Sequence, residues 1–384
     1  MRIGLDGFPL TELKTGVGTY TIKLACALAN GAPQDDFELI APRPFSATAL
    51  VESRPANLEL VYSKPNPLQQ RWWSIGLPAY IRRRSLTLYH GTNFEVPLQV
   101  RRPTVLTIHD LSWRLHSNTH EASVVRRGRL RLPLMARTAT LIVTPSDMVR
   151  REVCEYLKIK PDKVFSVPLA PGRELTPLSP DQTLPVRNRL GIEKEFLLFV
   201  GTIEPRKNLS TLLSAFEEIY RTTDLRPQLV IVGKLGWKVD KLLSQLEQSH
   251  ARDRVLLTGY LSDAELAALY SSCFLFIYPS VYEGFGLPPL EAMACGAPVL
   301  ASPVPSMTEG SETAAHIVPA DDTHALAKAI VELFYDAGAR QKLSAAGLKY
   351  VRNFSWERTA ALTREIYEEA IRRKRSKTQK AQAI

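Results

Sequence analysis

Two glutamates, Glu283 and Glu291, stand eight positions apart in the stretch YEGFGLPPLEAMACGAPVLAS. Two glycines and then two prolines lie between them, and proline fits the first turn of a helix because a missing N–H costs little there. A helix is therefore expected to begin near Leu287. The free N–H groups and the dipole of a helix N-terminus favour an anion, and a carboxylate can accept hydrogen bonds from a pair of hydroxyls. The stretch predicts a site for a phosphate flanked by two hydroxyl-rich groups.

The alternative is an ordinary surface loop, in which Glu291 merely complements the dipole at the start of a helix. That alternative accounts for one glutamate, whereas the complete order E-G-F-G-L-P-P-L-E is far less expected by chance. Glu283 precedes the expected helix and Glu291 falls about one turn into it, so both can face one ligand.

A pair of cations, Arg206 and Lys207, follows an apolar run in the stretch FVGTIEPRKNL. Asn208 is a favourable cap residue, so a helix is expected to open there. The pair then lies at the carboxyl end of a strand and can stabilise a diphosphate whose negative charge grows as a bond breaks. The alternative is two solvated cations, although cations are mildly disfavoured at a helix start.

Two histidine-containing loops also come directly after expected strands. His109 and Asp110 follow one of these strands, and His90 and Asn93 lie at the end of another. An imidazole can bond the hydroxyls of a sugar, which makes His109 a candidate for contact with a substrate. Asp110, which could orient His109, is a candidate for the acceptor side together with His90 and Asn93. The alternative for each histidine is a structural position in the core.

The stretch TGVGTY forms a glycine-rich loop between a strand and a helix, with Gly16 and Gly18 as its glycines. It lacks the third glycine and the acidic partner of a dinucleotide fingerprint. An NAD-dependent oxidoreductase, which would share parallel sheets, should show that complete fingerprint. A plain tight turn is the alternative explanation of the two glycines.

Short apolar runs alternate with helical stretches along the chain, which is typical of βαβ units and parallel sheets. Residues 168–190 contain five prolines and no regular period, so a linker is expected there. The sequence predicts an α/β protein with two doubly wound domains facing across a cleft, where such sheets bind ligands at strand carboxyl ends. The expected parts are an N-terminal Rossmann-like domain over 1–170, a linker over 171–190, a C-terminal Rossmann-like domain over 191–352, and a final helix with a basic tail over 353–384.

The net charge of +10 is concentrated in the first half of the 384 residues. Residues 1–165 hold 23 Lys or Arg against 14 Asp or Glu, and the tail RRKRSKTQK adds six more cations. Basic stretches, one of them with tryptophan, occur at 69–74, 81–85 and 126–133, and they suit an anionic membrane surface. A solvated basic face is the alternative, and nucleic acid is not expected because no recognition motif accompanies the charge.

Several classes of protein are disfavoured by what the sequence lacks. The four cysteines are scattered without metal-ligand spacing, so they are expected to be reduced thiols. No metal-nucleotide or Walker motif occurs, so neither a metal nor a cofactor is expected. No apolar run approaches 18 residues, and the N-terminus lacks a signal-peptide core. We expect a cytoplasmic protein, peripheral at the inner face of the cytoplasmic membrane.

The stretch from Glu283 to Glu291 resembles the E-x7-E signature of the retaining glycosyltransferase family 4, whose two-Rossmann-domain architecture is called GT-B. The resemblance covers essentially the whole chain, because further motifs match in order: TGVGTY, VTPSD, FVGTIEPRKNL, LVIVGKLGW and LTGYLSDAELAALYSSC. One departure is Thr202, which stands where many relatives carry an arginine directly after the glycine. That places more weight on Arg206 and Lys207.

The resemblance implies roles for these residues. Glu283 would hold the sugar, His109 would lie close to it, and Arg206 and Lys207 would neutralise the leaving diphosphate, so these four are the catalytic candidates. The donor-binding candidates are Glu291 on the ribose, Gly16 and Gly18 on the phosphates, and the backbone of Gly201, Gly284, Phe285, Gly286 and Leu287. Asp110, His90 and Asn93 remain acceptor-side candidates.

The activity implied is transfer of a hexose, with retention and without metal, from a nucleotide diphosphate sugar to an acceptor hydroxyl. Similar GTxEPRKN proteins favour mannose from GDP-mannose, in synthesis of bacterial surface polysaccharide or glycolipid, and the basic first domain suits a glycan or lipid-linked acceptor. The alternatives are a UDP-hexose-dependent enzyme of the same fold and a catalytically silent nucleotide-sugar-binding protein. A silent protein would typically have lost Glu283, Lys207 or His109, and this chain keeps all three.

Overall fold

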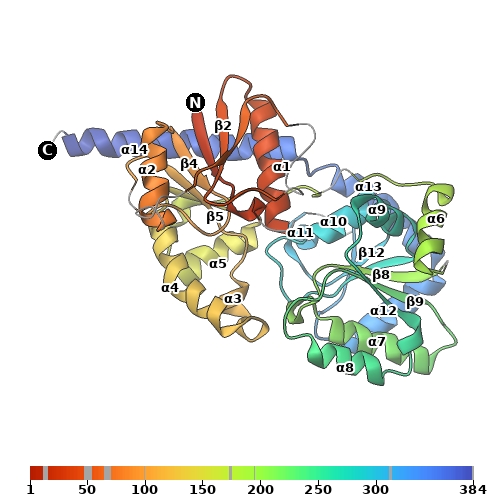
Figure 1. Ribbon diagram of the computed structural model, residues 1–384. Coiled ribbons are helices and arrows are strands. Elements are labelled where there is room, and N and C mark those ends of the chain that lie inside the picture. The colour runs from red at the N-terminus through yellow and green to blue at the C-terminus, as the bar shows by residue number, and fades with distance from the viewer. Residues whose placement is uncertain are drawn as a thin grey trace. The chain divides into compact units, whose positions relative to one another are not determined.

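The computed structural model describes residues 1–11, 16–46, 54–64, 71–98, 100–172, 175–193, 195–310 and 314–382. The chain folds into two compact units. Unit 1 comprises Met1–Arg114, Ser123–Gly172 and Phe354–Ile384, and unit 2 comprises Leu115–Ala122 and Arg173–Asn353. Each unit is built on a parallel sheet with helices packed against it, which confirms the predicted α/β class (Figure 1).

Among the residues just given, the sheet of unit 1 has seven parallel strands in the order β3-β2-β1-β4-β5-β6-β7. The strands are β1 Arg2–Asp6, β2 Asp36–Ala41, β3 Leu58–Tyr62, β4 Leu88–Gly91, β5 Thr104–Thr107, β6 Leu141–Thr144 and β7 Val164–Ser166. The helices are α1 Gly16–Gly31, α2 Leu77–Arg83, α3 Ser112–Leu115, α4 Ala122–Thr138, α5 Asp147–Leu157 and α14 Trp356–Gln382.

Within the same described ranges, unit 2 has six parallel strands in the order β10-β9-β8-β11-β12-β13. The strands are β8 Phe196–Val200, β9 Gln228–Val232, β10 Val255–Gly259, β11 Leu275–Tyr278, β12 Val299–Ala301 and β13 His316–Ile317. The helices are α6 Pro180–Leu190, α7 Leu209–Thr222, α8 Asp240–Gln248, α9 Asp263–Ser272, α10 Leu287–Ala294, α11 Pro305–Thr308, α12 Thr323–Tyr335 and α13 Ala337–Val351. In Figure 1, α7 and α12 cover one face of this sheet and α9 and α10 the other.

Each sheet has one point where the strand order reverses, and such points open a crevice at the carboxyl ends of the strands. The reversal lies between β1 and β4 in unit 1 and between β8 and β11 in unit 2. The loops that leave β8 and β11 contain the cation pair and the first glutamate of the sequence motifs. The fold of unit 2 therefore brings these two motifs to the same place.

The predicted linker contains a helix that the sequence pattern did not indicate. Helix α6 opens with a capping box between Ser179 and Gln182, and Pro180 occupies its first turn, where proline is tolerated. Thr183 is its buried residue, so the helix has no apolar stripe that could produce a helical period. The capping box sets the start of the helix, whereas the five prolines of this stretch had favoured an irregular linker.

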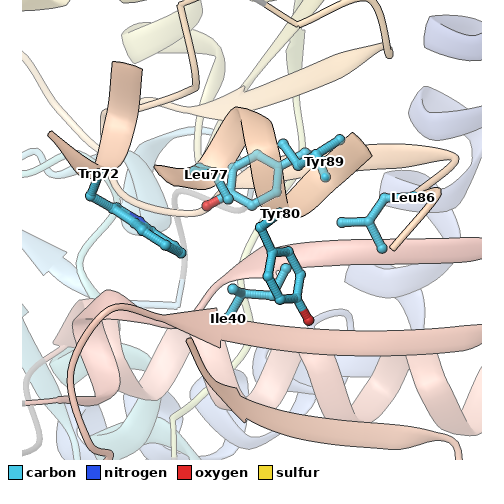
Figure 2. Packing of buried hydrophobic residues seen from close by; sticks show 7 residues of the cluster. Ile40, Trp72, Leu77, Tyr80, Leu86 and Tyr89 are labelled. Atoms are coloured by element: carbon cyan, nitrogen blue, oxygen red, sulfur yellow. The ribbon is translucent and has the colours of Figure 1, made fainter. Parts of the chain in front are cut away.

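The basic stretch 69–74 was expected to expose tryptophan, and this expectation is wrong for Trp72, which is 7% exposed. Its indole packs in a core cluster with Leu77, Tyr80 and Tyr89 (Figure 2). Residues 69 and 70 lie outside the described ranges. In the part of the chain that the structure describes, no helix is long and apolar enough to cross a membrane.

Candidate functional site

The loop after β8 presents the cation pair at the reversal point of unit 2. Residues Pro205–Lys207 form one turn of 3-10 helix, and Asn208 takes a left-handed conformation with φ +58° before α7 begins. The Asn208 side-chain amide donates to the carbonyls of Pro279 and Ala320. Because Pro279 follows β11, this amide ties together the two loops that leave β8 and β11.

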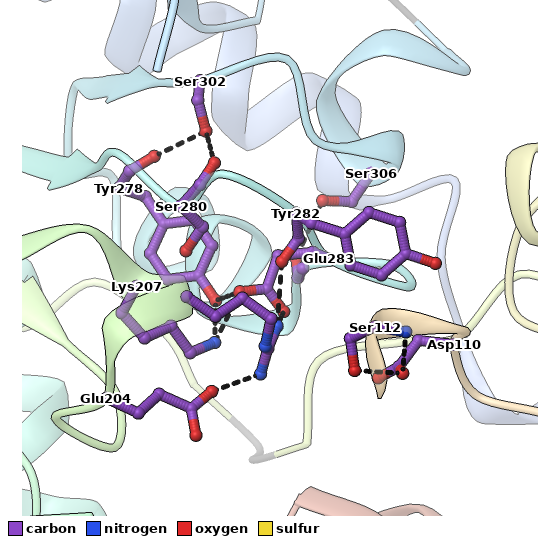
Figure 3. A network of polar contacts seen from close by, with 12 residues as sticks. Asp110, Ser112, Glu204, Lys207, Tyr278, Ser280, Tyr282, Glu283, Ser302 and Ser306 are labelled. Carbon is purple, nitrogen blue, oxygen red and sulfur yellow. Dashed lines mark hydrogen bonds and ion pairs between the residues drawn. The ribbon is translucent and has the colours of Figure 1, made fainter. Parts of the chain in front are cut away.

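Arg206, Lys207 and Glu283 form a buried ionic cluster between these loops (Figure 3). The Lys207 Nζ lies 2.5 Å from Glu283 Oε1, and the Arg206 guanidinium lies 2.8 Å from Oε2. Lys207 also donates to the Tyr278 hydroxyl at 2.8 Å, and that hydroxyl donates to Glu283 at 3.0 Å. Three of the candidate residues are thus in direct contact, and both carboxylate oxygens are engaged by cations.

The charges of the cluster depend on one another. Burial alone would raise the pKa of the Glu283 carboxyl, but Arg206 and Lys207 outweigh burial and lower it to about 2. Burial lowers the pKa of Lys207, and the charge of Glu283 opposes that shift. The cluster holds two cations beside a low-pKa carboxylate in a site largely closed to water, where electrostatic interactions are strong. It can bind an anion that replaces the carboxylate.

Glu204 is a member of this cluster that the sequence did not single out. Its carboxylate lies 2.6 Å from the Arg206 guanidinium, and the side chain is buried. Burial raises the pKa of Glu204, whereas Arg206 and Lys207 act to lower it. The position after a strand and before Pro205 resembles an ordinary loop, so nothing in the sequence marked it as buried.

Helix α10 begins where the sequence predicted, at Leu287, with Gly286 as its cap at φ +104°. The Gly286 carbonyl accepts a hydrogen bond from the Ser306 hydroxyl at 2.8 Å, and the Phe285 carbonyl accepts one from the Ser306 N–H at 2.9 Å. Two polar groups of Ser306 therefore hold the turn that carries Gly284 and Gly286. The turn leads directly into the N-terminus of the helix, whose dipole favours an anion, although Pro288 and Pro289 carry no N–H.

Glu291 lies in the second turn of α10 and is 3% exposed. The Tyr270 hydroxyl donates to its Oε2 at 3.2 Å. Gly201 lies directly after β8, and its N–H donates to the Val232 carbonyl at 2.9 Å. The donor-binding candidates of unit 2 thus occupy the carboxyl edge of one sheet.

In unit 1, His109 follows β5, and its Nε2 lies 2.8 Å from the Thr92 carbonyl. A carbonyl can only accept, so Nε2 carries the proton and Nδ1 keeps its lone pair in the neutral ring. The Tyr20 and Phe94 rings meet the imidazole edge to face at 4.9 and 5.7 Å. Burial lowers the pKa of His109, which favours the neutral ring at neutral pH.

The acceptor-side candidates are placed differently from one another. Asp110 accepts from the N–H and the hydroxyl of Ser112 at 2.9 and 2.6 Å, so one of its oxygens holds the start of α3 (Figure 3). His90 is fully buried, with its ring nitrogens 2.7 Å from the hydroxyls of Thr107 and Tyr367. Burial lowers the pKa of His90 to about 3. Asn93 is half-buried.

The glycine-rich loop of unit 1 is described in part, because residues 12–15 lie outside the described ranges. Gly16 is exposed as the first residue of α1, and a β-carbon added there would meet no atom within 4 Å. Gly18 is buried in the first turn of the same helix. Both glycines therefore belong to the opening turn of the helix.

A short segment of the first half of the chain, Leu115–Ala122, belongs to unit 2. The Trp237 indole N–H donates to the Thr119 carbonyl at 2.6 Å. The Lys238 ammonium donates to the carbonyls of Asn118 and His120 at 2.7 Å each. We call this segment the strap. From the sequence, the strap was expected to belong to the first domain. The motif LVIVGKLGW, which ends in Trp237, is the sequence feature that could have indicated the contact of the strap with unit 2.

The strap carries His116 to the rim of the ionic cluster. The His116 ring centroid lies 5.0 Å from that of Tyr282, whose carbonyl accepts from Arg206 at 2.9 Å. Burial and then the charge of Arg206 lower the pKa of His116. Among the described residues, no group of His, Cys, Asp and Glu side chains could hold a metal ion.

Comparison with known proteins places the chain in a family. The family model "Glycosyl transferases group 1" matches residues 182–350, and the family model "Glycosyltransferase Family 4" matches residues 14–170. O-antigen chain mannosyltransferase B of Escherichia coli is 30% identical over 387 residues, which cover 96% of this chain and 99% of that protein.

Two solved structures show the same fold. Sucrose-phosphate synthase from Thermosynechococcus elongatus has a TM-score of 0.76 at 22% identity, covering 96% of this chain and 98% of that one. Anabaena HepE in complex with UDP-glucose has a TM-score of 0.75 at 19% identity, covering 96% of this chain and 99% of that one. The chain therefore belongs to the group 1 glycosyltransferases of family 4 and has the GT-B fold.

Proposed function

We propose that the chain is a retaining hexosyltransferase that moves mannose from GDP-mannose to an acceptor hydroxyl in synthesis of a bacterial surface polysaccharide or glycolipid. The observation that carries the proposal is the buried cluster of Arg206, Lys207 and Glu283 at the strand-order reversal of unit 2. The name of the E. coli relative supports mannose. The complex of HepE with UDP-glucose supports a nucleotide diphosphate sugar as the class of donor for this fold.

The cluster suggests how the donor is held. The two cations engage both oxygens of Glu283. A donor diphosphate competes for Arg206 and Lys207, which then neutralise the charge that grows on the leaving phosphate. Glu283 is released to accept hydrogen bonds from the sugar hydroxyls, and Glu291 accepts from the ribose. The N-terminus of α10 adds a favourable dipole, so the proposal includes no metal or other cofactor.

Unit 1 supplies the remaining groups. His109 is proposed to accept a hydrogen bond from the transferred sugar at Nδ1, because its Nε2 proton is committed to the Thr92 carbonyl. Gly16 and Gly18 let the backbone approach the donor phosphates, and Asp110 and Asn93 face a glycan or lipid-linked acceptor. The acceptor attacks from the face that the phosphate leaves, and the departing phosphate takes its proton.

A peripheral contact with anionic membrane is a second part of the proposal, and helix α4 is the element that favours it. Leu130 and Leu134 are 72% and 49% exposed on this helix. Positions 127, 130, 131, 134 and 137 recur at spacings of three and four, so they share one face, and the other three positions are exposed arginines. Exposed leucines among arginines are typical of helices that lie in the interface of an anionic membrane.

The direct test is binding and turnover of a panel of nucleotide sugars by the purified protein. Calorimetry should show GDP-mannose binding more tightly than UDP-glucose, UDP-galactose and ADP-glucose, with NAD as the negative control. The purified protein should then transfer the sugar of a radiolabelled donor to an acceptor, or slowly hydrolyse the donor. A preference for a UDP-hexose supports the alternative donor, binding without turnover supports a silent binding protein, and binding of none of the donors overturns the proposal.

A further inference from the structure

Helix α14 presents one face to the interior of unit 1. Trp356 and Tyr367 are eleven positions apart, about three helical turns, so they lie on the same face. Thr359, Thr363 and Ala370 fall on that face as well and are buried. The Trp356 indole N–H donates to the Pro171 carbonyl at 2.8 Å, which fixes the start of the helix on unit 1.

A chain of buried hydrogen bonds leads inward from this face. The Tyr367 hydroxyl lies 2.7 Å from Nδ1 of His90, and Nε2 of His90 lies 2.7 Å from the Thr107 hydroxyl. The Thr107 hydroxyl in turn lies 2.9 Å from the Tyr20 hydroxyl. Each of these four side chains is at most 2% exposed. In such a setting every lost partner leaves an unpaired polar group, which is costly.

The chain of bonds ends at the ring that supports His109. The Tyr20 ring meets the His109 imidazole edge to face, with centroids 4.9 Å apart and planes at 86°. The ring centroid of Trp356 lies 6.2 Å from that of the same Tyr20 ring. Two residues of α14 therefore converge on Tyr20, one directly through its ring and one through His90 and Thr107.

We infer that α14 is a positioning element for His109 and acts through the series Tyr367, His90, Thr107 and Tyr20. The inference rests on the proposed function, in which His109 contacts the transferred sugar. The Thr92 carbonyl fixes one nitrogen of His109, but a single hydrogen bond leaves the ring free to tilt about it. The Tyr20 ring packed against the imidazole limits that tilt, and the chain of hydrogen bonds holds the Tyr20 hydroxyl.

The test removes single hydroxyl groups and keeps the rings. Tyr367→Phe and Tyr20→Phe each break the series at a different point, and Tyr80→Phe is the matched control. Tyr80 is likewise buried in unit 1 and donates to Glu38 at 2.7 Å, outside the series. Proton–nitrogen spectra of the histidine rings are recorded on each protein, and the signals of His109 are assigned with His109→Gln. The chain has seven histidines, so the spectra are tractable.

Both series variants should shift the His109 ring signals and lower kcat for sugar transfer by roughly tenfold, with KM for the donor changed less than about twofold. The double variant should be no worse than the more affected single one, because both changes break the same series. Tyr80→Phe should leave the signals and kcat unchanged. Unshifted His109 signals in Tyr367→Phe, or fully additive losses in the double variant, would overturn the inference. The spectra need no sugar transfer, so a parent protein without activity would contradict the proposed function alone.

Discussion

The Nζ atom of Lys207 lies 2.5 Å from Oε1 of Glu283, and the other oxygen of that carboxylate contacts Arg206 at 2.8 Å. One carboxylate thus contacts two cations, of which Lys207 is buried and Arg206 is largely buried. Arg206 has a second carboxylate partner in Glu204 at 2.6 Å, whereas the other polar contact of Lys207 in the cluster is the neutral Tyr278 hydroxyl. The consequences of losing Glu283 and of losing Lys207 are therefore unequal.

Glu283→Gln is expected to lower the free energy of unfolding by about 3–5 kcal/mol, because it leaves the Lys207 ammonium buried without its carboxylate partner. Lys207→Met should cost less, because Arg206 still contacts both remaining carboxylates. Urea unfolding of the two variants and of the double variant measures the difference. A greater loss in Lys207→Met than in Glu283→Gln would contradict this arrangement of charges. Both variants should lose sugar transfer.

The ionised state of Glu283 predicts a loss of stability in acid. A carboxyl whose pKa falls from 4.5 to about 2 on folding contributes stability that is complete above 4.5 and disappears as pH falls toward 2. Urea midpoints measured from about pH 6 down to about pH 3 should decline through this window. In Glu283→Gln the decline should be shallower, since this carboxyl no longer titrates. Parallel curves for the two proteins would show that the cluster does not hold Glu283 ionised.

Asp6 predicts a pH dependence of the opposite sign. Burial raises its pKa from 3.8 to about 8, although the Phe8 N–H opposes the shift. The folded protein therefore keeps a proton that the unfolded chain releases above about 3.8, and stability should fall by up to about 1.4 kcal/mol per pH unit until about pH 8.

Asp6→Asn resembles the protonated acid in shape and should flatten that dependence, so the variant should exceed the parent in stability at about pH 8. Asp36→Asn, at an exposed position on the neighbouring strand, is the control and should follow the parent. Thermal unfolding in a series of buffers checks this. An Asp6→Asn curve that stays parallel to that of the parent would show that Asp6 is ionised in the folded protein.

Gly286→Ala tests the turn before α10. At φ +104° a side chain is strained, and its β-carbon would lie 2.8 Å from the Ser306 hydroxyl oxygen that holds the Gly286 carbonyl. The change should cost about 1–3 kcal/mol in stability and weaken donor binding by roughly tenfold or more, because the helix N-terminus shifts. A β-carbon added at Gly31 would meet no atom within 4 Å. Gly31→Ala, the control, should therefore change stability and donor binding little. Equal donor affinities for the two variants would separate this turn from the donor site.

Helix α4 predicts membrane binding that depends on lipid charge. The double variant Leu130→Gln, Leu134→Gln should release the protein from vesicles that contain anionic lipid, whereas Leu184→Gln, which changes an exposed leucine of α6, should not. Added salt should weaken binding of the parent, because arginine attraction to lipid headgroups is screened. Cosedimentation measures each case. Equal retention of all variants, or no retention of the parent at low salt, would exclude α4 as the contact.

Much of the fold followed from the sequence because parallel strands buried on both faces appear as continuous apolar runs. The runs 196–200 and 299–301 are of this kind, and both are fully buried strands. Helix α10 was predicted at its observed start because Gly286 and the two prolines mark that boundary chemically. The family resemblance assigned Lys207 and Glu283 to one donor, the first on its diphosphate and the second on its sugar. Their direct contact was not predicted, and strand order explains it physically.

The parts that the sequence did not predict depend on contacts between distant residues. His90 resembles a loop histidine, and only the packing of α14, 277 positions away, makes it a buried partner of Tyr367. Glu204 looks like a solvated acid until Arg206 turns toward it. The strap has no local pattern that would assign it to unit 2, because its anchors lie near Trp237. Local periodicity contains no information on such pairings.

The strap has a consequence for how the protein can diverge. Trp237 and Lys238 bind three successive backbone carbonyls, those of Asn118, Thr119 and His120. Main-chain oxygens are present whatever the side chains are, so substitutions in the strap leave these bonds available, whereas substitutions at Trp237 or Lys238 remove them. Related sequences should therefore vary more at 118 than at Trp237 and Lys238, whereas the Thr119 hydroxyl and the His120 ring make side-chain contacts of their own. A chimera that exchanges residues 173–353 between relatives can retain the recipient's own strap.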